Sequence, residues 1–264
     1  MTRRLRQRFP SPQEIAPGIH YVEVGKALQR SNVYFITAGS TWCLIDTGSA
    51  DCASGIVQAA ASLFERQAPE GIFLTHDHPD HGGSARELAE RWGCPVWVHP
   101  DEMPLTRGDL SAVRLYANPL DRWVILPVLR LLGALRTQEI VARSSLEGVV
   151  RPLALAAELP GLPGWEAVST PGHTPGHVAF FRSSDRVVIA GDALVTVPMN
   201  SWRVFLKGRQ EVSLPPWFTT WDRERAGRSV EAMAALEPRV LGGGHGQPMA
   251  GPDIAARIGA LKRE

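Results

Sequence analysis

Three histidines and two aspartates occupy six consecutive positions within FLTHDHPDHGG, residues 73–83, although the whole chain has only eight histidines. Burying so many imidazoles and carboxylates together is costly unless a cation lies among them. His76, His78, Asp80 and His81 are therefore candidate metal ligands. Asp77 is better explained as a solvated or loop-stabilising carboxylate.

Three more candidate ligands each follow or adjoin an expected strand and have glycine beside them: His173 in STPGHTPGH, Asp192 in VIAGDAL and His245 in LGGGHGQP. Glycine allows the backbone to approach a ligand closely. Five histidines and two aspartates exceed what one tetrahedral zinc ion needs, and such mixed ligands suit zinc, iron or manganese. The set therefore predicts two divalent metal ions. Zinc is the expected metal, and iron and manganese are the alternatives.

The segments around these motifs predict an α/β fold. Apolar or alternating runs at 18–24, 32–48, 71–75 and 95–99 are typical of strands, and the periodicity of 53–67 and 84–92 indicates helices. Strands at about 165–172, 177–183 and 186–192 follow, then a helix over 222–238, a strand at 239–246 and a closing helix near 253–262. The two halves of the sequence have a similar order, strands and then a helix. This order predicts two sheets packed together with helices outside.

The expected domain organisation is a mobile basic tail over residues 1–14 and one domain over 15–264. Residues at about 104–159 are rich in Leu and Arg and contain no candidate ligand, so they are expected to form a helical insertion. Its stretch DRWVILPVLRLLGAL, 121–135, is too short and too interrupted to span a bilayer. It is expected to cover the active site or to form a homodimer contact, with a buried extra helix as the alternative.

Composition excludes several other classes of function. Lys and Arg together number 28 against 27 for Asp and Glu, a net charge of +1, which is not typical of nucleic-acid binding. Cys43, Cys52 and Cys94 have no CxxC spacing and predict no disulfide framework. No apolar run of signal-peptide length follows the basic N-terminus, so a cytoplasmic protein is expected.

The combined motifs resemble those of the metallo-β-lactamase superfamily. THDHPDHGG is similar to its HxHxDH signature, and PGHTPGH, GD and GGGHG are similar to its later ligand motifs in the same order. The resemblance implies an αββα sandwich of two mixed β-sheets with metals at one edge. It also implies two ligand sets and a bridge: His76, His78 and His173 for the first metal, Asp80, His81 and His245 for the second, and Asp192 between them.

Two further residues are expected to support this centre without binding metal. Asp46 in LIDTG matches the early aspartate of the superfamily, which orients the metal loop through hydrogen bonds. His177, in the same PGHTPGH motif as His173, is expected to support its loop.

An aspartate at position 192 favours the glyoxalase II-like and lactonase-like hydrolases of the superfamily over true β-lactamases. The predicted function is a dinuclear metal-dependent hydrolase, with Asp80 and Asp192 catalytic. A metal-bridging hydroxide would cleave an ester, thioester or lactone bond of a small molecule. The alternatives are a mononuclear iron persulfide dioxygenase and a non-catalytic binding module on the same fold.

An aromatic segment between Asp192 and His245 could form the walls of the substrate pocket. Packing of the same side chains on the core is the alternative. The expected pocket residues are Trp202, Phe205, Trp217, Phe218 and Trp221.

Overall fold

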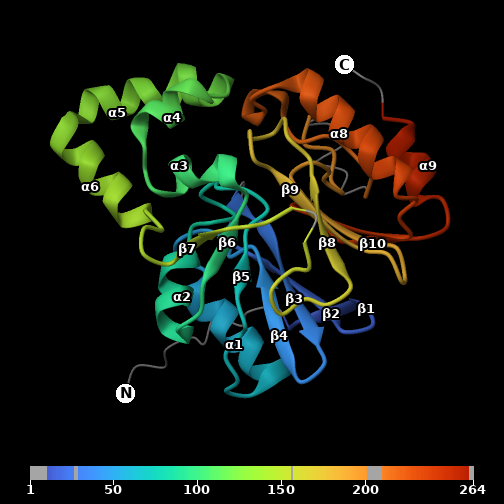
Figure 1. Cartoon of the computed structure of the whole chain (residues 1–264). Coiled ribbons are helices and arrows are strands. Elements are labelled where there is room, and N and C mark those ends of the chain that lie inside the picture. Colours follow the sequence, from blue (N-terminus) through green and yellow to red (C-terminus); the bar gives the residue numbers. More distant parts are fainter. Residues whose placement is uncertain (1–10, 27–28, 156, 201–209, 262–264) are drawn as a thin grey trace, which may run out of the picture.

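The structure is a computed structural model that describes residues 11–26, 29–155, 157–200 and 210–261. Two β-sheets lie face to face, and helices cover the outer face of each (Figure 1). Residues 1–10 of the expected basic tail lie outside the described residues, as do Trp202 and Phe205.

The first sheet has seven strands in the order of the sequence. Strands β1 to β4 are antiparallel, whereas β4 to β7 run parallel. Parallel neighbours need crossover connections, which α1 (Ala53–Phe64) and α2 (Ala85–Trp92) provide around β5. The strands are β1 (Gln13–Ala16), β2 (Ile19–Val24), β3 (Ser31–Ala38), β4 (Thr41–Ile45), β5 (Ile72–Phe73), β6 (Val96–Val98) and β7 (Val150–Pro152).

The second sheet has five strands in the order β12-β11-β10-β9-β8. Strands β10 and β11 are parallel and are connected through α8 (Arg223–Ala235), whereas the other pairs are antiparallel. A short helix, α9 (Ile254–Gly259), packs beside α8. The strands are β8 (Trp165–Ser169), β9 (Val178–Arg182), β10 (Val187–Gly191), β11 (Val240–Gly243) and β12 (Met249–Ala250).

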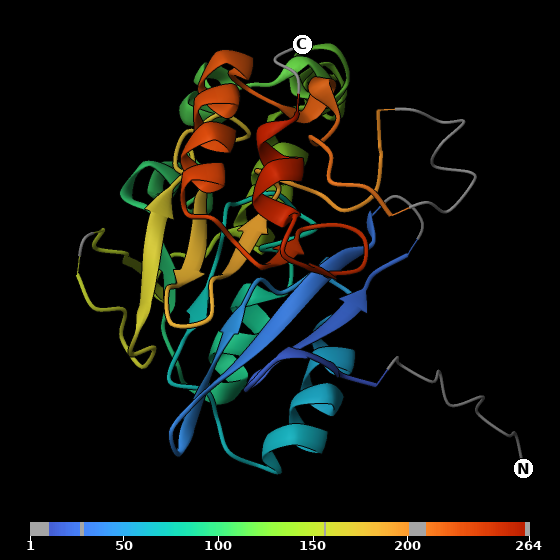
Figure 2. The ribbon, with the colours of Figure 1, turned by 90° about the vertical axis from the view of Figure 1, so that its right-hand side faces the viewer.

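Alternation along the strands divides the core into three apolar layers. On β3, Phe35 faces α1 and α2, whereas the next residue, Ile36, faces the second sheet. On β9, Phe180 faces the first sheet and Phe181 faces α8 and α9. The layers are therefore helix, sheet, sheet and helix, which confirms the predicted αββα sandwich (Figure 2).

The helical insertion is shorter than the sequence predicts. Helices α3 (Met103–Thr106), α4 (Leu110–Leu115), α5 (Leu126–Leu132) and α6 (Ala134–Ser144) fill its first part, with a π-helical turn at Asp121–Ile125 before α5. Residues 150–152, expected within the insertion, instead form β7 beside β6. Val150 is buried in the layer under α1 and α2, so burial fixes this strand at the sheet edge.

The N-terminal boundary also differs from the expected one. Strand β1 begins at Gln13, so residues 13 and 14 belong to the first sheet and not to the tail. Among the described residues, no helix has both the length and the apolar composition needed to cross a bilayer.

Replacing Trp42 with Ala tests the outer layer of the first sheet. Trp42 is fully buried, stacks on Phe64 with ring centroids 4.5 Å apart and meets the edge of Trp92. We expect Trp42→Ala to lower the free energy of unfolding by about 3–5 kcal/mol, because the substitution leaves a large cavity. Urea unfolding at a fixed metal concentration measures this loss.

The matched control is Trp123→Ala, because Trp123 is 69 % exposed. Its loss should be about 0.5 kcal/mol or less. Equal losses for the two tryptophans would contradict the packing described for Trp42.

Candidate metal centre

Loops from both sheets meet at one edge of the sandwich and bring the candidate ligands together. The segment from His76 to His81 follows β5, and His173 lies in the turn between β8 and β9. Asp192 follows β10, and His245 follows β11. Because β10 and β11 are parallel, their carboxyl ends place Asp192 and His245 at the same edge.

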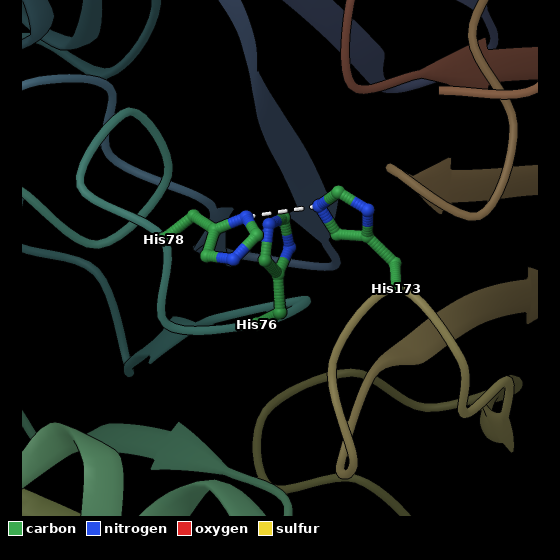
Figure 3. Close-up of side chains that lie close together, drawn as sticks. All are labelled: His76, His78 and His173. Carbon is green, nitrogen blue, oxygen red and sulfur yellow. Dashed lines mark hydrogen bonds between the residues drawn. The ribbon is translucent and has the colours of Figure 1, made fainter. Parts of the chain in front are cut away.

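The seven candidates form two adjoining groups with a carboxylate between them. His76, His78 and His173 form one group, and Asp80, His81 and His245 form the other, with ligand atoms in each group within 4.8 Å of one another. His173 Nε2 and His78 Nδ1 are 2.9 Å apart (Figure 3).

Asp192 lies where the two groups meet. Its Oδ2 is 3.4 Å from His173 Nε2 and 3.3 Å from His245 Nε2, and its Oδ1 is 3.4 Å from His81 Nε2. Ligands of a tetrahedral zinc ion with bonds of 2.0–2.1 Å are about 3.3 Å apart. These spacings are therefore those of atoms that share a metal ion.

Unpartnered atoms inside the cluster test whether a metal fits there. His76, His81 and Asp192 are each at most 4 % exposed. Among the described residues, His76 Nε2, His81 Nε2 and Asp192 Oδ1 have no hydrogen-bond partner. A buried polar atom without a partner is costly, and a divalent cation would satisfy all three atoms at once.

Hydrogen bonds at the other ring nitrogens fix which nitrogen each histidine presents. Nδ1 of His81 donates to Asp46 Oδ2 at 2.8 Å, and Nδ1 of His245 donates to the Arg30 carbonyl at 2.5 Å. Nδ1 of His76 is 3.0 Å from Thr75 Oγ1, which itself donates to Asp46. In each of these rings Nε2 therefore faces the centre, where it can bind a metal ion.

Charge inside the cluster also suits a cation. Burial, followed by the neighbouring His81, holds the pKa of His76 well below its ordinary value, so this ring is neutral. Burial raises the pKa of the Asp192 carboxyl, but His245 and His81 outweigh burial and leave that pKa well below its ordinary value. Asp192 is therefore a buried carboxylate anion among imidazoles.

Asp46 anchors the histidine loop from beneath. Its carboxylate accepts hydrogen bonds from the Thr75 backbone N–H at 2.8 Å, from Thr75 Oγ1 and from the His81 ring. Asp46 has φ of 60°, in the left-handed region that Asp and Asn tolerate better than most residues. The carboxylate is thus tied to both ends of the segment that carries His76 and His81.

His177 contacts the backbone of Asp192. Its Nε2 accepts the Asp192 N–H at 3.1 Å, and its Nδ1 is 2.8 Å from Thr170 Oγ1. Burial lowers the pKa of His177 to about 3, so the ring is neutral and Nδ1 carries the proton. Both ring nitrogens are used, and His177 positions the strand end that carries Asp192.

Glu102 was not selected from the sequence, yet it joins the two loops that carry His78 and His173. It is fully buried, its Oε2 accepts the Asp77 N–H at 2.9 Å, and its Oε1 accepts the Gly176 N–H at 2.8 Å. Glu102 follows β6, whose carboxyl end lies beside that of β5. Its place after this strand end indicates that Glu102 lies near the site. The same place does not distinguish Glu102 from its exposed neighbour Asp101.

A cavity of about 1160 Å³ opens beside the metal centre and is lined by His173, Asp192, Leu214, Pro215 and Trp217, among others. Of the expected pocket residues, Trp217 lines this cavity, Phe218 packs against Trp217, and the Trp221 N–H donates to the His173 carbonyl.

The helical insertion adjoins this cavity. Trp123 contacts Trp217, with ring centroids 6.3 Å apart, and Tyr116 contacts Trp221 at 5.3 Å. Leu131 of α5 is 88 % exposed, so the alternative of a buried extra helix is wrong.

Comparison with known families identifies the family to which this fold belongs. The sequence model of the metallo-beta-lactamase superfamily matches residues 28–245, which include every candidate ligand. The chain belongs to this superfamily. The match confirms the resemblance seen in the ligand motifs.

Two relatives of this chain are named as hydrolases. It is 36% identical over 252 residues to "Probable metallo-hydrolase YflN" of Bacillus subtilis, covering 94% of this chain and 91% of that one. It is 25% identical over 130 residues to "Hydroxyacylglutathione hydrolase GloC" of Haemophilus influenzae, covering 47% of this chain and 49% of that one. The protein is thus a metallo-hydrolase of the metallo-beta-lactamase superfamily.

Solved structures agree with this assignment. The metallo-beta-lactamase family protein TTHA1429 from Thermus thermophilus is 25% identical, with a TM-score of 0.62 over 93% of this chain and 78% of that one. TTHA1623, described in a di-iron-bound form, is also 25% identical, with a TM-score of 0.55 over 89% of this chain and 97% of that one.

Replacing Asp46 with Asn tests its role in this metallo-hydrolase. Asn also tolerates the left-handed backbone, but its amide cannot accept hydrogen bonds at both positions. We expect metal affinity to fall about 10–100-fold, mainly for the ion held with His81. Competition with a chromogenic chelator measures the two affinities. Asp51→Asn, at an exposed aspartate paired with Lys26, is the control, and equal affinities in the two variants would refute the role of Asp46.

Glu102→Gln tests the link between the two loops. The amide has one acceptor, so either the Asp77 or the Gly176 N–H loses its partner, at a cost of about 1–3 kcal/mol. We expect weaker metal binding by the group that contains His78 and His173, measured by the same competition. Glu90→Gln, at an exposed glutamate paired with Arg86, is the matched control. If Glu102→Gln binds metal as tightly as this control, the loops do not depend on Glu102.

Proposed function

We propose that this chain is a dinuclear hydrolase that cleaves an ester, thioester or lactone bond of a small molecule. The observation that carries the proposal is the position of Asp192. One of its oxygens lies 3.4 Å from a histidine of one ligand group and 3.3 Å from a histidine of the other. A single carboxylate between two groups is the arrangement expected for a bridging ligand.

With two divalent ions bound, such a centre would supply an activated water molecule and polarise the carbonyl oxygen under attack. His76, His78 and His173 would hold one ion, and Asp80, His81 and His245 the other. The di-iron form described for TTHA1623 supports two ions in this fold. Zinc, iron and manganese all suit these ligands.

The chain's own residues orient the reaction. Asp46 and His177 hold His81 and Asp192 in place, so these ligands need not reorganise when a substrate binds. The Asp80 side chain is 22% exposed, and its Oδ2 is 3.5 Å from His245 Nε2. In this proposal Asp80 would accept the proton that the attacking water releases.

The cavity beside the centre supports a small-molecule substrate. Its volume of about 1160 Å³ is somewhat larger than the roughly 300–1,000 Å³ typical of ligand pockets, and Leu214, Pro215 and Trp217 give it apolar walls. The name of the Haemophilus relative, a hydroxyacylglutathione hydrolase, supports a thioester as the first substrate class to assay.

Asp192→Ala tests the proposal directly. Elemental analysis of the wild-type chain should give two metal ions per chain, and the variant should retain one. We expect turnover of thioester, ester and lactone substrates to fall more than about 100-fold, beyond the 10–100-fold typical of losing a residue that only supports a ligand. Asp253→Ala, at an exposed aspartate beside Arg257, is the control.

Two outcomes would overturn the proposal. Two ions and unchanged turnover in Asp192→Ala would remove the bridging role. One iron ion per wild-type chain, with oxygen uptake on a persulfide substrate, would instead assign the persulfide dioxygenase reaction.

A further inference from the structure

The helical insertion exposes an unusual amount of apolar surface. Nine of the eleven large apolar side chains that are exposed among the described residues lie between residues 115 and 140. The other two, Trp217 and Phe218, adjoin them through the contact of Trp217 with Trp123. We call the nine the insertion face: Leu115, Trp123, Val124, Ile125, Val128, Leu131, Leu132, Leu135 and Ile140.

Helix α5 is apolar on both sides. Leu126 and Leu129 are half-buried, whereas Val128, Leu131 and Leu132, spaced as neighbours on one side of a helix, point into solvent. Thr137 Oγ1 of α6 donates to the Leu129 carbonyl and holds the two helices together. A helix that is apolar all round is normally covered by something, and here only one side is covered.

The charges around the insertion face are strongly positive. Residues 110–144 contain five arginines against two acids, a net charge of +3, whereas the whole chain has +1. All five arginines are exposed, and none forms an ion pair within the described part of the chain. They are Arg114, Arg122, Arg130, Arg136 and Arg143. A partner that complements this surface would therefore be both apolar and anionic.

We propose that the insertion face docks on a membrane surface that contains anionic lipids. Apolar side chains flanked by arginines are the composition of helices that lie in the plane of a bilayer interface. Trp123 and Trp217 are aromatic residues of the type that gathers at that interface. Figure 1 shows α5 and α6 at the periphery of the molecule, away from α1.

A second copy of the chain fits this surface less well. A symmetric dimer joins a patch to itself, so it would bring the five arginines of both protomers to one interface. Two acids on each protomer cannot neutralise them. Lipid phosphates supply the opposite charge without this repulsion.

Docking in this way would place the substrate cavity beside the membrane. Trp217 belongs to the cavity wall and contacts Trp123 of the insertion face. The docking itself does not depend on the proposed hydrolysis, because none of the nine side chains of the insertion face is a ligand candidate.

Vesicle sedimentation with the full metal-loaded chain tests the docking. Vesicles of phosphatidylcholine alone are compared with vesicles of equal parts phosphatidylcholine and phosphatidylglycerol. We expect binding to the second kind only, weakening as salt is added. The double variant Arg130→Glu, Arg136→Glu should bind at least about 25-fold more weakly, since one arginine at such a surface contributes about fivefold.

Two more variants separate charge from apolar contact. Leu131→Ser with Leu135→Ser should weaken binding at least about tenfold while keeping the arginines. Arg66→Glu with Arg91→Glu removes the same charge from exposed positions near the ends of α1 and α2, and should bind like the wild type. Circular dichroism confirms that each variant is folded, which is expected because all the replaced side chains are exposed.

Three outcomes would overturn the proposal. One is that the wild-type chain binds neither kind of vesicle. Another is that all the arginine variants bind equally well. The third is that sedimentation velocity shows a dimer which Leu131→Ser with Leu135→Ser dissociates, while no vesicle binds, because the second copy would then be the partner.

Discussion

Burial of a carboxylate and five imidazoles at one edge of the sandwich is the constraint on which the rest of the site depends. Asp192 and the histidines lose most of their contact with water, and the ligand atoms of His76, His81 and Asp192 lie within 4.8 Å of one another. Such a cluster is stable only with cations inside it and with every other polar atom satisfied around it. Asp46, Thr75, His177 and Glu102 meet the second requirement, so much of the polar interior serves to hold ligands still.

The fold creates that edge by repeating one arrangement. In each sheet a crossover helix joins parallel strands, α1 before β5 in the first sheet and α8 before β11 in the second. The carboxyl ends of these strands therefore open on the same edge, and loops from both sheets meet there. Asn32 secures the junction, since its side chain donates to the Gly243 carbonyl across 211 residues of sequence. The first sheet thus supports the loop of the second sheet that carries His245.

The sequence is enough to nominate the ligand candidates that the structure brings together, because their signal is local. His76 to His81 are crowded into one short loop, and the others follow glycine-flanked strand ends, so residue type and spacing suffice. Residue type and spacing do not reveal Glu102 and Asn32, because these residues act through hydrogen bonds to loops that are distant in sequence. The end of the insertion differs from the expected one for a similar reason, since β7 is a strand only because β6 lies beside it and Val150 is buried.

The insertion and the sheet edge that carries the candidate ligands are held in place by different interactions. The edge is held by buried hydrogen bonds. In the insertion, α5 packs on α6 and on the turn before it, and Tyr116 and Trp123, which precede α5, contact Trp221 and Trp217. Substituting exposed residues of such a hairpin costs the sandwich little, because few core contacts are lost. Its surface is therefore free to vary in composition without disturbing the metal ligands. In this chain it has become apolar and cationic, although exposed apolar side chains in water bring no gain in folding stability.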